Sequence, residues 1–582
     1  MTQNSHSTSS VPTRLSSAVF RAKATALQGR RFVTDTFIDR AVKHAVGTAM
    51  LADAVIAESA TPLWTETEPE ERFLVAGKIH NLRLAIRAID GIEIKAGQTF
   101  SFWRQVGRAV RRRGYVRGRE LREGCVIPNI GGGLCQLSNA LYDAALQANF
   151  EIVERHAHTQ VIPGSLAETG RDATVFWNYI DLRFRSPNAF RIEAVLDAER
   201  LTVRFRGKKV TEKQLYQISR NGSGHAEVGS CATCGVDDCH RVVREPSTAD
   251  FGKAAWLVDE RTPEFDAYLQ RERKTADTLL IPLDGKRFRK GNYAWTTDGF
   301  SAVRQSPAVT AIRSYRSRKL SAQGAARQQN LLEMYRRLAE SYAKKLSYDV
   351  LHVVVQQNLL PFLWSGGHLG GRTFDVLMNS LPMWELQCRL DIAAELHPQS
   401  TTLGDFRADA RLIADEKEAL ANARRVITPH TAIAEMFIEK AELLPWHQPV
   451  AIKNSQNGGG KPTLAFPAST VGRKGCYELR EAIGGMDVRL ITLGPYIESQ
   501  DFWKGLDVVR GTDDDLGKAD LVVLPAFVEH RPRRLLSAVA SGIPVIASEA
   551  CGVANIANIH TIPAGDASAL GKTIGRLLDV NK

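Results

Sequence analysis

The sequence predicts a multidomain protein in which an α+β domain precedes a pair of doubly wound α/β domains with parallel sheets. Its 582 residues exceed what one hydrophobic core organises. Helical and alternating apolar patterns mix in the first half, whereas short apolar runs alternate with helical segments from about residue 275. The expected order is an N-terminal tail and helix at 1–71, the α+β domain at 72–210, a connector at 211–274, and α/β domains at 275–450 and 451–582.

Composition narrows the class of protein and its partners. The 44% hydrophobic and 24% charged residues are typical of a folded protein and exclude a disordered or collagen-like chain. Lys and Arg number 76 against 64 for Asp and Glu, and the net charge of +12 favours anionic partners such as phosphates, nucleotides or acidic glycans. Because we find neither a signal-peptide pattern nor an apolar run of membrane-spanning length, we expect a cytoplasmic protein. Nucleic acid is not expected as its partner.

Apolar spacing predicts the elements of the first half in order. An amphipathic pattern over Phe37–Ile56 predicts a helix, and two further helices are expected at 72–90 and 134–148. Alternating residues predict strands over Thr174–Phe184 and Phe190–Val203. The glycines at 131–133 come directly before the helix at 134–148 and deliver Cys135 to its first turn.

The position of Cys135 suggests a reactive thiol. Unpaired amides and the helix dipole at a helix N-terminus favour the thiolate. His158 and Asp172 follow within the same domain, so a nucleophile, a base and an orienting carboxylate are all available. The alternative is that Cys135 is a small buried apolar residue and the glycines serve packing.

These residues belong to a set of motifs that resembles the VanW family, which is named from vancomycin-resistance gene clusters. The resemblance covers about residues 72–205 and rests on Asn81–Ala85, Ala96–Phe102, Gly131–Gln136, Arg155, His158, Gly170–Thr174 and Asp181–Phe184. It implies Cys135, Gln136, His158, Asp172 and Asp181 as candidate site residues. A hydrolase or acyl transferase in which Cys135, His158 and Asp172 are catalytic is our hypothesis for this domain.

Eight arginines lie between Arg104 and Arg122, against a single acid, Glu120. This run predicts either an anion-binding rim for phosphate or a cell-wall precursor, or a solvated basic face.

A cysteine cluster in the connector predicts a metal site. Its candidate ligands are Cys231, Cys234, Cys239, His240 and His225. Thiolates in a Cys-x-x-Cys spacing can hold one tetrahedral ion, and Gly235 lets the chain fold back for the third thiolate. Zinc is expected, with His240, His225 or an external group as fourth ligand, and an iron–sulfur cluster is the alternative. A redox Cys-x-x-Cys or a coincidence of spacing are the remaining interpretations.

The second half alternates buried strands with helices. Apolar runs predict strands at Leu279–Ile281, Val350–Val355, Val426–Thr428, Pro462–Phe466, Val488–Leu493, Leu521–Leu524 and Pro544–Ala547. After the strand at 462–466, Gly472, Arg473 and Lys474 open a helix, which predicts either a diphosphate site or an ordinary helix start with incidental basic residues. A second glycine-rich loop, at 365–372, predicts an acceptor or phosphate loop or a simple mobile turn.

The succession Ala519–Pro525, Glu529 and Leu535–Ser548 resembles the nucleotide-binding domain of two-domain (GT-B) glycosyltransferases of the retaining, glycogen-synthase-like type, and the likeness extends over about 275–582. It implies that Arg473 and Lys474 hold the donor diphosphate and that Glu529 is the first acid of a paired-glutamate motif. Ser537 stands where the family has the second glutamate. The candidate donor-binding residues are Gly472, Arg473, Lys474, Ser537, Gly366, Gly367, His368 and Arg372, with Glu529 catalytic.

The sequence therefore predicts a VanW-like protein whose second half transfers sugar from a nucleotide-activated donor to an anionic envelope or glycan precursor. The VanW likeness connects this activity with cell-envelope assembly and antibiotic resistance. Two alternatives remain: a cysteine-dependent hydrolase or acyl transferase in the VanW-like domain, or a non-catalytic scaffold that binds sugar nucleotides or envelope precursors.

Overall fold

The computed structural model describes residues 14–38, 42–65, 69–122, 125–158, 165–211, 229–230, 252–320, 324–452 and 460–578. The chain forms two compact units. Unit 1 comprises Met1–Lys253 together with the segments Ser347–Leu351 and Gly366–Arg372. Unit 2 comprises Ala254–Leu346, His352–Ser365 and Thr373–Lys582.

Unit 1 is an α+β domain built on antiparallel sheets. Its largest sheet has the order β1 (Val55–Pro62), β9 (Arg200–Gly207), β8 (Phe190–Leu196) and β2 (Glu93–Ile94). Two smaller sheets join β10 (Gly229–Ser230), β5 (Cys125–Ile130) and β4 (Arg117–Arg122), and β3 (Thr99–Ser101), β7 (Arg183–Arg185) and β6 (Glu151–Glu154). The helices are α1 (Arg14–Val33), α2 (Pro69–Ile86), α3 (Phe102–Val106) and α4 (Cys135–Gln147).

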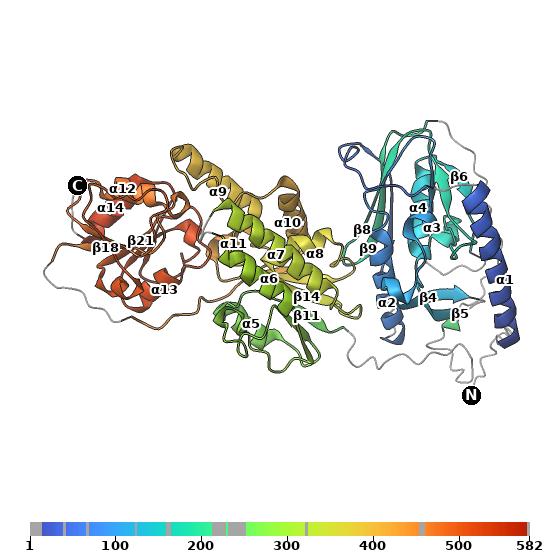
Figure 1. Cartoon of the computed structure of the whole chain (residues 1–582), viewed down its shortest axis with the longest axis horizontal. Helices are drawn as coiled ribbons and strands as arrows, with labels where there is room; N and C mark the ends of the chain where they lie inside the picture. Colours follow the sequence, from blue (N-terminus) through green and yellow to red (C-terminus); the bar gives the residue numbers. More distant parts are fainter. Residues whose placement is uncertain are drawn as a thin grey trace. The chain divides into compact units, whose positions relative to one another are not determined.

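The core of unit 1 lies between its helices and the largest sheet. Helix α4 packs against β1 and β9, and α2 against β4 and β8 (Figure 1). Four fully buried phenylalanines, Phe150, Phe184, Phe190 and Phe205, contact one another in this core. Burial of such rings supplies the main stabilisation of a small sheet-and-helix domain, and it fixes the sheet on which α4 carries Cys135.

The helices expected in unit 1 are largely present. The segments 72–90 and 134–148 correspond to α2 and α4, although α2 ends at Ile86, and a turn with Gly91 at φ 78° follows. The helix predicted over Phe37–Ile56 is wrong. Helix α1 ends before this stretch, and Val55 and Ile56 belong to β1. Val46 is exposed, so a helical apolar face there would bury nothing, whereas pairing with β9 satisfies the backbone of β1.

The predicted strands of unit 1 need two corrections. Over Thr174–Phe184 only the last two residues enter a strand, because Phe176 and Ile180 close a tight turn with Asn178 at φ 58°. The stretch Phe190–Val203 is not one strand but the hairpin of β8 and β9. Asp197 accepts hydrogen bonds from the backbone N–H groups of Glu199 and Arg200, and this side-chain turn interrupts the strand.

Unit 2 contains two wholly parallel sheets. The first has the order β13 (Ala302–Gln305), β12 (Thr278–Ile281), β11 (Ala254–Leu257), β14 (His352–Gln356), β15 (Thr373–Leu377), β16 (Arg425–Thr428) and β17 (Ala441–Leu443). The second has the order β20 (Val508–Arg510), β19 (Arg489–Thr492), β18 (Thr463–Phe466), β21 (Leu521–Leu524), β22 (Val545–Ser548) and β23 (Ile559–Ile562).

Both strand orders run outward from a central strand and then reverse, as in doubly wound folds. The predicted pair of doubly wound domains with parallel sheets is therefore confirmed. Strand β11 lies within the segment 211–274 that we expected as a connector, so the first sheet takes in part of that segment. The run of four residues that forms β11 is too short to distinguish from a loop without its neighbours β12 and β14.

Helices connect the strands of unit 2. They are α5 (Pro263–Glu272), α6 (Pro307–Arg318), α7 (Ala325–Ala343), α8 (Leu360–Ser365), α9 (Met383–Leu396), α10 (Ala410–Asn422), α11 (Thr431–Met436), α12 (Cys476–Ile483), α13 (Arg533–Ala540) and α14 (Ala567–Leu578). Figure 1 shows α6, α7 and α8 side by side. The linker predicted near 450–460 falls mostly outside the described residues. Among the helices that the structure describes, none has the length and apolar character needed to cross a membrane.

Candidate functional site

The glycine loop of unit 1 places Cys135 at the start of α4. Gly131 and Gly133 have φ values of 77° and 96°, which other residues rarely adopt. A Cβ on Gly132 would overlap the carbonyl of Gly118, so the close approach of this loop to β4 also requires glycine. The first hydrogen bond of the helix runs from the Gln136 N–H to the Gly133 carbonyl, at 3.1 Å. The N–H groups of Leu137 and Ser138 donate to the Leu134 carbonyl in the same turn, at 3.1 and 3.2 Å.

The structure brings Cys135, His158 and Asp172 together. His158 Nδ1 lies 2.6 Å from Asp172 Oδ2, Cys135 is near enough to His158 to raise the pKa of the imidazole, and Cys135 Sγ donates to the Val175 carbonyl at 3.9 Å. Because Nδ1 is engaged with Asp172, Nε2 is the ring nitrogen that can reach the thiol. We call these three side chains the Cys135–His158–Asp172 relay.

The carboxylate of the relay is buried and held in place. The Asp172 side chain is 4% exposed and that of His158 is 17% exposed. Asp172 also accepts hydrogen bonds from the backbone N–H of His158, at 2.6 Å, and from Arg155 Nη2, at 2.8 Å. The Arg155 guanidinium stacks over the Tyr142 ring of α4 with its carbon 5.1 Å from the ring centre. A carboxylate with this many donors stays ionised and orients the imidazole.

Electrostatics keeps His158 protonated. Burial by itself lowers the pKa of His158, but the hydrogen bonds to Asp172 and Cys135 outweigh it and raise the pKa from 6.5 to about 10. Burial likewise raises the pKa of Asp172, and the contacts with His158 and Arg155 overcome that effect and lower it. An imidazolium next to the sulfur stabilises the thiolate, which is the nucleophilic form of cysteine.

Neighbouring residues of α4 fix the segment that carries Asp172. The Ser138 hydroxyl donates to the Ala173 carbonyl at 2.6 Å, and Asn139 accepts from the Ala173 N–H at 2.8 Å. Gln136, a candidate from the family resemblance, donates to the Thr61 hydroxyl at 2.9 Å and to the Pro62 carbonyl at 2.8 Å. Gln136 thus ties the start of α4 to the end of β1.

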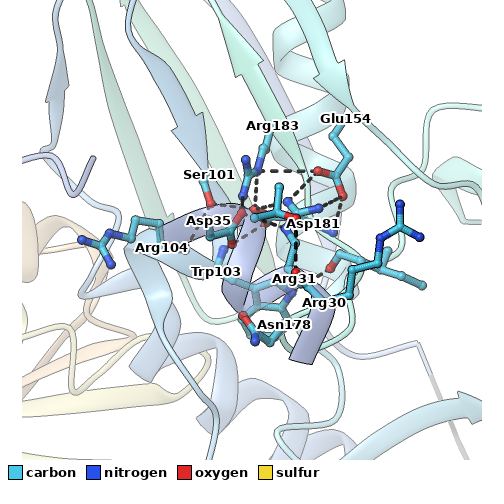
Figure 2. Close-up of polar contacts among 12 residues, drawn as sticks. Arg30, Arg31, Asp35, Ser101, Trp103, Arg104, Glu154, Asn178, Asp181 and Arg183 are labelled. Carbon is cyan, nitrogen blue, oxygen red and sulfur yellow. Dashed lines mark hydrogen bonds and ion pairs between the residues drawn. The ribbon is translucent and has the colours of Figure 1, made fainter. Parts of the chain in front are cut away.

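Asp181, the fifth candidate, lies in a different network (Figure 2). It accepts hydrogen bonds from the Ser101 hydroxyl at 2.6 Å, the Trp103 N–H at 3.1 Å and Arg183 Nε at 3.0 Å. Burial raises the pKa of Asp181 despite these donors. In this network its carboxylate satisfies buried donors at the junction of β3 and β7.

The same network attaches α1 to the domain. Arg31 donates through both terminal nitrogens to the Glu154 carboxylate, at 3.1 and 2.7 Å, and through Nε to Asp35, at 3.0 Å (Figure 2). Asp35 in turn accepts from Arg183 at 2.7 Å. These contacts hold an ordered helix before β1, within the segment that we expected as an N-terminal tail and helix.

The arginine run lies beside the glycine loop. Arg104, Arg108, Arg111 and Arg112 are exposed. A Cβ on Gly131 would come within 2.6 Å of the Ala109 side chain, so the segment that carries these arginines packs against the loop before Cys135. Both the anion-binding and the solvated interpretation of the run remain predictions.

The predicted metal ligands Cys231, Cys234, Cys239, His240 and His225 lie outside the described residues. Within the described ranges, no group of three or more His, Cys, Asp and Glu side chains is arranged to hold a metal ion.

In unit 2, the basic loop follows β18 at the point where the strand order of the second sheet reverses. Lys474 Nζ lies 2.9 Å from Glu529 Oε2 and 2.8 Å from the Val528 carbonyl. The Phe527 N–H donates to the Arg473 carbonyl at 3.0 Å. A Cβ on Gly475, whose φ is 75°, would overlap the Pro525 carbonyl, so this glycine permits the contact between the loops after β18 and β21. We call Arg473, Lys474 and Glu529 the switch-point cluster.

The switch-point cluster has an ionised carboxylate in a buried setting. Burial raises the pKa of Glu529, but Lys474 outweighs this and lowers it from 4.5 to about 2. Burial lowers the pKa of Arg473, whose guanidinium carbon lies 4.2 Å from the centre of the Phe406 ring. Carboxyl ends of parallel strands at a reversal point are the usual ligand site of such folds.

Sequence reasoning missed Glu498. Its carboxylate accepts hydrogen bonds from the Gly472 N–H at 2.6 Å, the Ser400 hydroxyl at 2.8 Å and the Tyr477 hydroxyl at 3.1 Å, and from Thr402. Glu498 thereby fixes the loop that carries Arg473. No local pattern marks it, because its partners are distant in sequence.

A second missed group lies at the reversal point of the first sheet. Arg313 Nη1 donates to both oxygens of Asp259, at 2.7 and 2.9 Å, and Asn358 donates to Asp259 at 2.8 Å. Glu260 pairs with Arg313 and, at 2.9 Å, with Arg531, whose N–H donates to Glu529 at 2.7 Å. An acidic pair directly after an apolar run was the available signal, but it lay in the expected connector.

The other predicted donor-binding residues lie elsewhere. Ser537 is half-buried on α13. Gly366, Gly367, His368 and Arg372 belong to unit 1, whereas Arg473 and Lys474 belong to unit 2. Arg372 is buried and donates to the carbonyls of Val350, His368 and Ser347.

A protein-family model matches the part of the chain that contains the relay. Residues 77–206 match the family model described as VanW like protein. The chain carries a VanW domain. The resemblance predicted for residues 72–205 is therefore confirmed, and Cys135, His158 and Asp172 all lie within the matched residues.

Curated relatives match the VanW domain and only part of their own length. The vancomycin B-type resistance protein VanW of Enterococcus faecalis is 36% identical over 154 residues, which are 25% of this chain and 54% of that protein. The uncharacterized protein YoaR of Bacillus subtilis is 38% identical over 107 residues, which are 18% of this chain and 35% of that protein.

Solved structures match 56% of the chain. They include the sucrose-phosphate synthase of Thermosynechococcus elongatus, with 16% identity, a TM-score of 0.36 and 90% of that chain covered. HepE of Anabaena in complex with UDP matches with 13% identity, a TM-score of 0.34 and 90% coverage. A glycosyltransferase of Rickettsia africae matches with 10% identity, a TM-score of 0.31 and 88% coverage.

Proposed function

We propose that the VanW domain is a cysteine-dependent acyl transferase or hydrolase. The observation that carries the proposal is the 2.6 Å contact between His158 Nδ1 and Asp172, on an imidazole whose pKa Cys135 also raises. A nucleophile, a base and an orienting acid in hydrogen-bond reach are what covalent acyl transfer requires.

The steps follow from the positions of the three groups. Cys135 Sγ attacks the carbonyl carbon of an acyl donor and forms a C–S bond, while His158 gives its proton to the departing amine or alcohol. The acceptor, an amine or water, then attacks the thioester carbon, its proton passes to His158, and the C–S bond breaks.

A direct test is acylation of the thiol by p-nitrophenyl acetate, followed by intact-mass and peptide mass spectrometry. We expect one acetyl group on Cys135 and a burst of p-nitrophenol. The burst should disappear in Cys135→Ser and persist in Cys388→Ser, because Cys388 is an exposed cysteine outside the relay. Equal acetylation of Cys135 and Cys388 would contradict the proposal.

A second function, glycosyl transfer from a nucleotide-activated donor, is favoured by the switch-point cluster of unit 2. Arg473 and Lys474 supply two cations at the reversal point of a doubly wound sheet, where a diphosphate commonly binds. Lys474 and Glu529 are paired at 2.9 Å, so the ammonium is held in position before the donor arrives.

In this proposal the two cations stabilise the charge that develops on the leaving nucleoside diphosphate. Glu529 is the carboxylate adjacent to them, whereas Ser537 offers a hydroxyl where the resemblance calls for a second acid. The net charge of +12 supports an anionic acceptor, and a role in cell-envelope or glycan assembly is our proposal for its biological use.

Thermal-shift measurements with a panel of nucleotides and nucleotide sugars test this second function. A ligand that binds the native state raises the apparent melting temperature. We expect at least one nucleotide sugar to stabilise the wild-type chain and Cys135→Ala, and to lose its effect in Arg473→Ala and Lys474→Ala. Lys504→Ala, an exposed change in the same sheet domain, is the matched control. A shift that survives both basic-residue substitutions would overturn the proposal.

A further inference from the structure

Unit 1 contains a second group of positive charges, separate from the relay. The cation cluster consists of Arg83 and Arg87 on or just after α2, Arg372, and the two histidines His80 and His368. Arg87 Nη2 lies 2.6 Å from His368 Nδ1. Arg83, Arg87 and Arg372 are near enough for each guanidinium to affect both imidazoles.

Glycines allow the segment 366–372 to reach α2. The Gly371 N–H donates to the Asp197 carbonyl at 2.7 Å, and Arg83 Nε donates to the Gly370 carbonyl. A Cβ on Gly371 would overlap Ile79, and one on Gly370 would come within 2.7 Å of Leu196 Cβ. The glycine-rich loop that we expected to hold a donor or acceptor therefore packs on unit 1, and this packing brings Arg372 and His368 beside Arg83 and Arg87.

The central guanidinium of the cluster is buried and incompletely paired. Arg83 is 3% exposed, and its Nη1 is buried with no hydrogen-bond partner among the residues that the structure describes. A buried guanidinium without a partner is costly, because its hydration is lost and nothing replaces it. Arg372, 4% exposed, uses its nitrogens on backbone carbonyls, which carry no full charge to balance it.

Among the described residues, no carboxylate forms a hydrogen bond with Arg83, Arg87 or Arg372. Asp349 is the acid that acts on Arg372, and it is already paired with Lys253 at 2.9 Å. Burial, followed by the neighbouring guanidiniums, lowers the pKa of Arg83 and lowers that of Arg372 to about 9. The same two causes lower the pKa of His368 to about 3, so this imidazole is neutral and accepts from Arg87.

We propose that Arg83, Arg87 and Arg372 form a binding site for a phosphate or diphosphate group, in which Arg83 Nη1 donates to the bound oxyanion. The site is distinct from the switch-point cluster and does not depend on either proposed function. Arg87 is exposed and forms its solvent side, while Arg83 and Arg372 form its buried side.

A phosphate fits these residues better than a carboxylate does. Guanidinium groups bind phosphate oxygens in pairs of parallel hydrogen bonds, and three of them match the charge of a dianion or of pyrophosphate. The ligand would also join α2 to the segments 347–351 and 366–372, since Arg372 already holds both segments through Ser347, Val350 and His368.

The test uses the full chain and inorganic pyrophosphate as the probe. Arg473→Gln/Lys474→Gln is the background, so that the switch-point cluster does not contribute. Calorimetric titration at about 0.2 M NaCl suppresses weak surface binding. We expect saturable binding that Arg87→Gln weakens about tenfold or more, while Arg72→Gln, an exposed change on the same helix, alters it less than about twofold. No saturable binding, or equal affinities in these two variants, would overturn the site.

Arg83→Met gives an independent readout. Without pyrophosphate we expect its melting temperature to rise, because an uncompensated buried charge is removed. With pyrophosphate we expect no further rise, in contrast to the background protein. A melting temperature that rises with pyrophosphate as much as that of the background would contradict the role of Arg83. If Arg83→Met fails to fold, the pyrophosphate titration of the exposed Arg87→Gln variant still tests whether the site exists.

Co-sedimentation with phosphatidate vesicles tells the two sources of phosphate apart. Vesicle binding that Arg87→Gln abolishes assigns a lipid headgroup, and pyrophosphate binding without vesicle binding assigns a soluble phosphorylated ligand. Both results support the site, and the absence of both kinds of binding refutes it.

Discussion

The two candidate sites use a buried carboxylate in opposite ways. In the relay of unit 1, Asp172 orients an imidazole and keeps it protonated next to a thiol. In the switch-point cluster of unit 2, Glu529 pairs directly with the cation of Lys474. In our proposals, the first arrangement serves proton transfer, whereas the second holds a cation in position for an anionic ligand. The comparison teaches that a perturbed carboxylate acquires its role from the group it contacts.

Two aspartates of unit 1, Asp172 and Asp181, differ in the same way: each is buried, but they contact different groups. Asp172 and Asp181 have similarly buried side chains, at 4% exposure each. Asp172 contacts an imidazole that reaches a thiol, but Asp181 contacts a guanidinium, a hydroxyl and backbone N–H groups. Of these contacts, only the imidazole and thiol near Asp172 can exchange a proton near neutral pH. We therefore propose that Asp172 takes part in the reaction and that Asp181 stabilises the fold. The predictions below separate these roles.

Asp172→Asn should have the largest effect on the relay. The amide cannot hold the imidazolium, so the pKa of His158 should fall and the positive charge beside the Cys135 sulfur should be lost at neutral pH. We expect alkylation of Cys135 by iodoacetamide at pH 7 to slow about tenfold or more. Peptide mass spectrometry gives the rate, with Cys388 as internal reference. An unchanged pH profile of alkylation would show that Asp172 has no part in activating the thiol.

Glu498→Gln should weaken the donor loop of unit 2. The side-chain NH₂ of glutamine cannot accept from the Gly472 N–H and the hydroxyls that now point at Glu498, so buried donors lose their acceptor. We expect a loss of about 2–4 kcal/mol in the free energy of unfolding and weaker nucleotide-sugar binding. Urea titration and thermal shift measure the two effects. Glu481→Gln, exposed on α12, should change neither, and a similar result for both variants would count against a positioning role.

The two sites should lose stability at opposite ends of the pH scale. The pKa of His158 is raised from 6.5 to about 10, so its contribution is fully present below pH 6.5 and is lost as the pH rises through 10. The pKa of Glu529 is lowered from 4.5 to about 2, so its contribution is present above pH 4.5 and is lost as the pH falls through 2.

Melting temperatures measured from pH 3 to pH 10 test this contrast. His158→Ala should flatten only the alkaline limb, and Glu529→Gln only the acidic limb. A variant that flattens the opposite limb would reverse our assignment of the two charges.

Asp181→Asn should have the smallest effect on chemistry. It leaves Arg183 with a weaker buried partner, and we expect a cost of about 1–3 kcal/mol in the free energy of unfolding. Alkylation of Cys135 should stay within about twofold of the wild-type rate, because among the described residues no hydrogen bond joins Asp181 to Cys135, His158 or Asp172. A slower alkylation with unchanged stability would instead place Asp181 in the chemistry.

Much of the relay was predictable because its parts have local signatures. Glycines at 131–133 before an amphipathic helix fix Cys135 at the helix start, since few other residues reach the φ values of that turn. The parallel strands of unit 2 were predictable for a similar reason: strands buried on both faces are continuous apolar runs. The contacts of Glu498 and the pairing of Asp259 with Arg313 were not predictable, because the partners lie far away in the sequence.

The sequence by itself determined seven strands of the two parallel sheets (β12, β14, β16, β18, β19, β21 and β22) and the residue types available for chemistry. Local backbone preferences and apolar periodicity depend on a few neighbouring residues, so they can be recognised in the sequence. Tertiary structure alone decided which groups meet: that His158 joins Cys135 and Asp172, that Asp181 does not, and that the loop at 366–372 packs on α2 beside Arg83. Hydrogen bonds and charge interactions depend on distance in space, and only folding sets that distance.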